Sequence, residues 1–179
     1  MPPLTAVFAH GDSKKQEQPG VCSFSEPSVE AGFREFVDRY GARTRAIVYA
    51  MFGDQHLADE VSAGVFVEAH RSPFGTADPW LELVRLAGQA CRRRHWLAVI
   101  RGERRNDQVY RNREPAHHQT KNAIQLLSKL SWHERFLLVL RDVAQLSIEQ
   151  MAAVLDLAPE RVKSDLLRAR MAAVKAAKK

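Results

Sequence analysis

Residues 147–170 read SIEQMAAVLDLAPERVKSDLLRAR, and this stretch decides the fold because it contains two short helices and the turn between them. Ser147 and Gln150 have the spacing of a capping box, and Pro159 suits the first position of a second helix. Asp156 lies where a left-handed residue would turn the chain sharply, a conformation that Asp tolerates better than most residues. The pattern predicts a helix-turn-helix whose second helix contacts DNA.

In the second helix, which begins at residue 159, apolar and basic side chains lie on opposite faces. At about 100° per residue, one stripe is apolar and the opposite stripe is basic. Residues 159–179 contain seven Lys or Arg and two acidic residues, so we expect attraction to phosphate. A solvated face on an ordinary bundle helix is the simpler alternative, but the turn and the caps favour DNA binding. The candidate DNA-contacting residues are Glu160, Arg161, Lys163, Ser164 and Arg168.

The composition indicates a folded chain with an anionic partner. The 179 residues are 45% hydrophobic and carry a net charge of +6, with a pI of about 9.6. This balance favours nucleic acid, or less often a membrane surface, as partner. No run approaches the roughly 18 apolar residues of a membrane-spanning helix, and the N-terminus lacks the features of a signal peptide. We therefore expect a cytoplasmic location without membrane insertion.

Motifs that carry catalytic chemistry are missing from the sequence. It contains no GxGxxG, P-loop, GxSxG or HExxH, so we expect neither an enzyme nor a bound cofactor. Cys22 and Cys91 are too few for a disulfide framework, and no CxxC pair suggests zinc. Cys91 and His95 could form half a metal site. Because Cys91 falls on an apolar stripe, where a core cysteine is far more common, we expect no metal.

Hydrophobic periodicity divides the chain into two helical units, which makes the expected fold class all-α. We expect a flexible leader over residues 1–27, a four-helix domain over 28–102, a flexible linker over 103–118 and a helix-turn-helix domain over 119–179. In the first domain, Gly41 is expected to join two helices, and the next two cover about 55–70 and 79–101. In the second, helices over about 120–129 and 132–143 precede the helix-turn-helix, and Ser131 and Glu134 have capping-box spacing at the start of the latter.

A second basic surface is expected on the helix that begins at Pro79. Six Arg and one Glu lie between residues 92 and 105, and an aromatic residue accompanies the basic stripe. Such a stripe suits single-stranded or melted nucleic acid, because cations follow the backbone and a flat ring stacks on an unpaired base. The alternative is a solvated helix end with Trp96 packed on its neighbour. The candidate residues are Arg85, Gln89, Arg92, Arg93 and Trp96.

Short motifs occur in a characteristic order along both units. The first contains FREFV at 33–37, GD at 53–54, ADEV at 58–61 and PWL at 79–81; the second contains AIQLL at 123–127, LLVL at 137–140, LSIEQMA at 146–152 and RVKS at 161–164. In this order and spacing, the chain resembles the extracytoplasmic-function sigma factors, the small two-domain members of the bacterial sigma-70 family. The likeness covers roughly residues 30–100 and 120–176.

The resemblance implies an alternative sigma factor, which binds core RNA polymerase and directs promoter recognition and transcription initiation. The first unit would be sigma-2-like, with Asp54, Asp59 and Glu60 docking on polymerase and the helix 79–96 opening and reading the minus-ten promoter element. The second would be sigma-4-like and would read the minus-thirty-five element. Promoter DNA and an anti-sigma factor are the other implied partners.

Three departures from the family pattern bear on these roles. Ala63 and Gly64 stand where the family usually has Gln and an acidic residue, Asp165 stands where a basic residue is common, and Val84-Arg85-Leu86-Ala87 replaces the usual stretch of the minus-ten helix. Two alternatives therefore stay open: a sigma-like decoy or adaptor that binds an anti-sigma factor, and a helix-turn-helix repressor. A dimeric repressor needs a self-association surface, whereas the acidic residues favour polymerase docking.

Overall fold

The computed structural model describes residues 26–71, 78–101 and 118–178, and within these ranges every regular element is helical. The elements are α1 (Glu26–Phe52), α2 (Gln55–Arg71), α3 (Pro79–Ile100), α5 (His118–Ser128), α6 (Trp132–Leu138), the π-helix η1 (Val139–Val143), α7 (Ile148–Leu155) and α8 (Pro159–Ala177). None of these helices is long and apolar enough to cross a membrane. The expected leader over residues 1–27 lies almost wholly outside the described residues, and so does the expected linker over 103–118.

The first unit differs from expectation at Gly41, which does not join two helices. α1 runs unbroken through this position, so the described part of the unit has three helices and not four. A glycine inside a helix costs about 1 kcal/mol relative to alanine, but here the core-facing stripe continues past it through the buried Thr44, Ile47 and Met51. Tertiary burial of that stripe therefore keeps the helix continuous.

Local signals set the end of α1 and the starts of α2 and α3. Gly53 adopts a left-handed φ of 70°, which a glycine allows without steric penalty, and so ends α1. Asp54 then accepts a hydrogen bond from the backbone N–H of Leu57 at 3.0 Å, at the start of α2. Asp78 caps α3 in the same way, accepting from the backbone N–H of Trp80 at 3.0 Å. α2 and α3 therefore agree to within a residue with the expected helices over about 55–70 and 79–101.

The second unit contains one irregular helix. The expected 132–143 helix is α only as far as Leu138, and its last turn is the π-helix η1, where Ala144 N–H donates to the carbonyl of Val139 at 2.9 Å. The wider turn leaves Val139 and Leu140 buried next to each other. The buried run covers residues 135–140 and begins in the regular turns of α6, so this helix is enclosed on several sides and not on one face alone.

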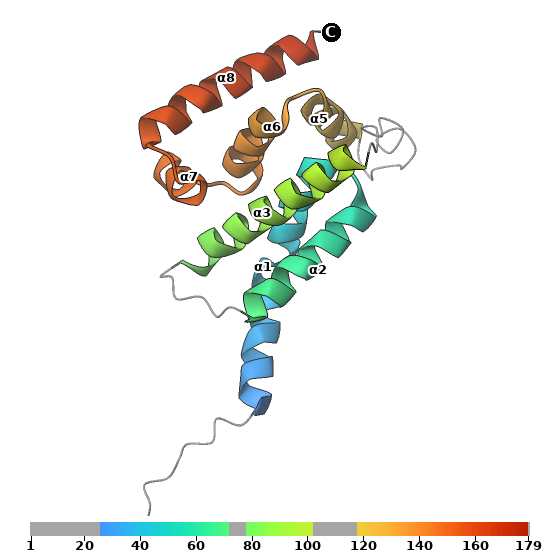
Figure 1. The fold of residues 1–179 in the computed structure, drawn as a ribbon, viewed down its shortest axis with the longest axis vertical. Coiled ribbons are helices and arrows are strands. Elements are labelled where there is room, and N and C mark those ends of the chain that lie inside the picture. Colours follow the sequence, from blue (N-terminus) through green and yellow to red (C-terminus); the bar gives the residue numbers. More distant parts are fainter. Residues whose placement is uncertain (1–25, 72–77, 102–117, 179) are drawn as a thin grey trace, which may run out of the picture.

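The two units share one hydrophobic core, which extends from Ile47 in α1 to Ala169 in α8. Figure 1 shows α6 and α7 lying against α3, with α8 at the far end of the molecule from the start of α1. Arg135 of α6 is buried and donates from Nη1 to the carbonyl of Met51 at 2.6 Å, which links the second unit to the end of α1. Phe136 packs directly on Gly88, where an added Cβ would lie 2.5 Å from the ring Cζ atom.

Candidate nucleic-acid interface

The helix-turn-helix has the local geometry expected from its sequence. Ser147 Oγ accepts from the backbone N–H of Gln150 at 3.1 Å, and Gln150 Oε1 accepts from the backbone N–H of Ser147 at 2.9 Å. Asp156 ends α7 in the left-handed conformation, with φ 55° and ψ 49°. Pro159 begins α8. These contacts fix the angle at which α8 leaves the turn, and with it the surface that α8 presents.

The face of α8 expected to contact DNA is exposed. Val162, Leu166 and Ala169 are buried on the opposite face, as the phase predicted. The exposed side chains occupy the first three turns, the part that reaches base edges in this motif. All five sequence candidates are exposed on this helix: Glu160, Arg161, Lys163, Ser164 and Arg168.

One residue of α8 has surroundings that the sequence did not predict. Asp165 is 5% exposed, and its carboxylate accepts hydrogen bonds from Arg161, four residues earlier, and from Arg168, three residues later. Burial alone would raise its pKa, but the two guanidinium hydrogen bonds outweigh burial and hold the pKa of Asp165 below its ordinary value. The helical spacing of the three residues was visible in the sequence, whereas the burial was not.

The basic stripe of α3 is also exposed. Its opposite face, formed by Trp80, Leu83, Val84, Ala87 and Cys91, is buried against the core. Trp96 is 59% exposed, so it does not pack into a neighbouring helix as the simpler alternative supposed. Arg85 forms an ion pair with Glu82 on the same helix. The exposed candidates on this stripe are Arg85, Gln89, Arg92, Arg93 and Trp96.

The three acidic candidates of α2 have different surroundings. Asp54 caps the helix through the Leu57 N–H, and Asp59 forms an ion pair with Arg45 of α1. The hydrogen bond from Arg45 is the main cause that lowers the pKa of Asp59. Glu60 is exposed on the next position of the helix. The ion pair and the cap reduce the negative charge that this surface offers to a partner.

Cys91 has the surroundings of a core residue. It is fully buried, and burial raises the pKa of its thiol to about 12, so the thiol is protonated at neutral pH. His95 lies one turn further on, its ring 6.4 Å from that of Trp132. Within the described ranges, no three His, Cys, Asp or Glu residues are grouped so that they could hold a metal ion.

Two exposed apolar groups were not recognised in the sequence. One lies at the end of α3, and the other forms an i, i+4, i+7 stripe along the outer face of α8. The α8 stripe could have been found from its spacing, because it occupies a third phase between the basic and buried faces. The side chains are Leu97, Val99 and Ile100 in α3 and Leu167, Met171 and Val174 in α8.

Comparison with known proteins agrees with this arrangement. Residues 121–172, which contain the helix-turn-helix, match the family model of Sigma-70, region 4. The structure of CnrH in complex with the cytosolic domain of CnrY is similar, with a TM-score of 0.63 and 23% identity over 82% of this chain and 87% of that chain. The sigma factor RpoE of Bartonella quintana, in complex with the anti-sigma factor NepR, is also similar. Its TM-score is 0.63 and its identity is 18%, over 82% of this chain and 97% of that chain. No curated protein matches the sequence.

The fold similarity covers more of the chain than the family match. The family model covers residues 121–172, which include most of α5 to α8, whereas each similar structure covers 82% of the chain. Residues 121–172 are therefore similar to sigma-70 region 4, and the chain shares its all-α fold with CnrH and with the sigma factor RpoE.

Proposed function

We propose that this chain is an alternative sigma factor, which binds core RNA polymerase and directs it to promoter DNA. The observation that carries the proposal is the position of the region 4 match, because residues 121–172 include the capped turn and the exposed basic face of α8. Sigma-70 region 4 and a fold shared with sigma factors support this function over that of an ordinary repressor. This role also places the chain in the cytoplasm.

Two exposed basic faces support separate DNA contacts within this function. The α8 face would contact the minus-thirty-five element as a duplex, since a helix of this kind enters the major groove. The α3 stripe would contact the minus-ten element, where the exposed Trp96 can stack on an unpaired base. Residues 28–102 and 119–179 would then act as the two promoter-binding domains.

Polymerase docking would use the acidic side of α2. Because Asp54 caps the helix and Asp59 is paired with Arg45, the exposed Glu60 is the acidic side chain best placed to meet a basic partner surface. Ala63 and Gly64 are exposed on the same helix and add no charge to it. An anti-sigma factor would be a further partner, since RpoE was solved in complex with one.

Run-off transcription tests the proposal. Purified core polymerase, with and without the chain, is supplied with promoter fragments from the same genome, and transcripts are resolved by length. A sigma factor produces discrete transcripts that depend on the chain. A repressor or a decoy gives none, and a decoy additionally captures an anti-sigma factor while leaving core polymerase unbound.

A further inference from the structure

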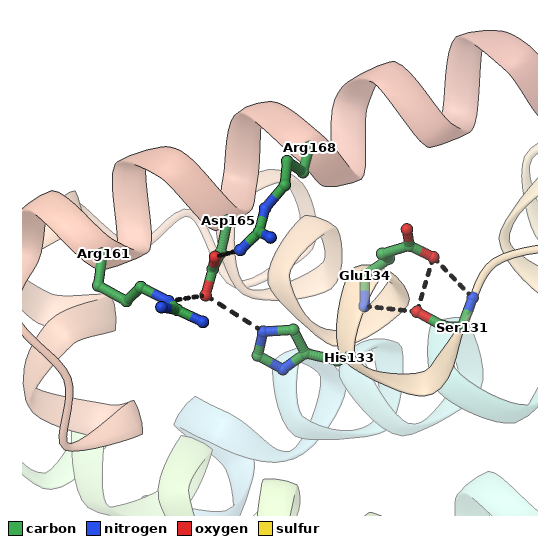
Figure 2. Close-up of polar contacts among 6 residues, drawn as sticks. All are labelled: Ser131, His133, Glu134, Arg161, Asp165 and Arg168. Atoms are coloured by element: carbon green, nitrogen blue, oxygen red, sulfur yellow. Dashed lines mark hydrogen bonds and ion pairs between the residues drawn. The ribbon is translucent and has the colours of Figure 1, made fainter.

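Asp165 lies at the centre of a small ionic cluster between α8 and α6 (Figure 2). Its Oδ2 accepts from Arg161 Nε at 3.0 Å, and its Oδ1 accepts from Arg168 Nη2. His133 of α6 places Nε2 3.6 Å from the same Oδ2. Asp165 is almost wholly buried, whereas both arginine side chains are 64% exposed. The carboxylate therefore lies beneath two guanidinium groups that face solvent.

The atoms used in these hydrogen bonds differ between the two arginines. Arg161 donates through Nε, which leaves its two Nη groups unused by the cluster. These two groups form the end-on pair with which arginine contacts the O6 and N7 atoms of guanine. Arg168 donates through one of the two N–H bonds of Nη2, so its other four N–H donors are not used by the cluster. Arg168 lies about two turns after Arg161 on α8, further from the N-terminal residues that reach base edges, so contact with the phosphate backbone is expected there.

The cluster also restricts movement. An exposed arginine samples many rotamers, and fixing them on binding costs about 0.5–1.5 kcal/mol per side chain. A hydrogen bond to a buried, helix-borne carboxylate fixes Arg161 before DNA arrives. The helix pair α6 and α8 is closely packed, and His133 contacts Asp165 from the α6 side, so the carboxylate itself has a defined position.

We propose that Asp165 is a positioning residue for sequence recognition, which holds Arg161 with its end-on pair directed to a base. The inference rests on the proposed function, because it takes α8 as the helix that contacts the minus-thirty-five element. Asp165 stands where a basic residue could contact a phosphate group. Its carboxylate makes no such contact but orients the guanidinium of Arg161.

The test uses core polymerase loaded with the full chain. The wild-type complex selects a minus-thirty-five sequence from promoters randomised only in that element, and binding is then measured on the selected and a scrambled element over a range of salt concentrations. Asp165→Asn is expected to lower the ratio of the two affinities about five- to tenfold. Affinity for the scrambled element should stay equal or rise, because the helix loses one negative charge.

Three variants separate positioning from charge and from folding. Asp142→Asn removes a negative charge near Arg170, 4.0 Å from it, without touching the cluster, and should change both affinities equally. Arg161→Ala should lose the discrimination by itself, and adding Asp165→Asn to it should cause no further loss, because the two residues act together. If Asp165→Asn does not fold, Asp165→Glu is measured in its place. Its ratio of affinities for the selected and scrambled elements is expected to lie between the ratios of wild type and Arg161→Ala.

The outcomes are distinguishable. If the wild-type complex selects no sequence, the proposed function is wrong and this inference fails with it. If selection succeeds but Asp165→Asn changes both affinities by the same factor, as Asp142→Asn does, only the positioning role is wrong. A wild-type ratio in a folded Asp165→Asn or Asp165→Glu variant would also overturn it.

Discussion

Asp156 determines, at the scale of a single residue, how sharply the chain turns between α7 and α8. Its φ of 55° is a conformation that costs most L-residues roughly 1–2 kcal/mol. The turn is closed by the N–H of Leu157, which donates to the carbonyl of Ala152 at 3.0 Å. The position is exposed, so its backbone conformation and not its side-chain packing limits the choice of residue.

Asp156→Gly is therefore expected to stabilise the chain by up to about 1 kcal/mol, because glycine adopts the left-handed conformation without steric penalty. Urea denaturation followed by circular dichroism measures the change. Asp156→Val, a β-branched residue in the same conformation, is the matched control and should destabilise. A glycine variant less stable than wild type would show that the Asp156 side chain contributes more than the backbone conformation costs.

Glu60 gives a second prediction for a single residue. Glu60→Lys should weaken the complex with core polymerase, because it reverses an exposed charge on the α2 surface proposed to dock. Pull-down of core polymerase at several salt concentrations measures this. Asp59→Asn is the comparison, and its effect should be smaller because Arg45 already neutralises that carboxylate. Equal recovery of polymerase by Glu60→Lys and wild type would remove α2 from the docking surface.

Helix caps are the features of whole elements that the sequence predicts best. The two capping boxes, at Ser131 and at Ser147, are confirmed because each depends only on residues three positions apart. The unbroken course of α1 and the π turn of η1 were not predicted. In both, burial against a distant element outweighs the local preference of a residue such as Gly41. A single sequence does not show which distant element will bury a given segment.

The α6 cap predicts a pH dependence. The hydrogen bond from the Ser131 hydroxyl is the main cause that lowers the pKa of Glu134 from its ordinary 4.5. A lowered pKa means that the stabilisation is complete above the ordinary value and is lost as the pH falls through the folded-state value. Ser131→Ala should cost about 1 kcal/mol near pH 7, and the cost should shrink below pH 4.5.

Denaturation of Ser131→Ala and wild type at a series of pH values measures this difference. Glu134→Gln is the control, because glutamine keeps the capping hydrogen bonds but does not titrate. In the Glu134→Gln background, the cost of Ser131→Ala should not vary with pH. A difference that is constant with pH in the native background would mean that the carboxylate contributes nothing to this cap.

At the scale of the whole molecule, the two units are joined by contacts between residues far apart in sequence. Arg135 binds the carbonyls of Leu127, Ser128 and Leu130 in its own unit as well as that of Met51 in the other. The exposed faces of α3 and α8 could be predicted from helix periodicity alone. The contact between the units, and the Asp165 cluster with His133, needed the packing of separate helices and could not be read from local pattern.

Because one core spans both units, urea should unfold the chain in a single transition. Arg135→Met should destabilise this transition by about 2–4 kcal/mol, since it leaves buried carbonyls without a charged donor. Fluorescence and circular dichroism of the same samples measure it. Two separated transitions in the wild-type chain would mean that the units unfold independently and that their contact adds little stability.

The contact of Phe136 with Gly88 also constrains how the sequence can change over evolutionary time. Any side chain at position 88 would bring a Cβ to 2.5 Å from the phenyl ring, so alanine there requires the ring to move or to be replaced. The two positions, 48 residues apart in the numbering, should therefore vary as a pair. Relatives with alanine or serine at position 88 should carry a smaller side chain than phenylalanine at position 136, and a substitution at one position alone should be rare.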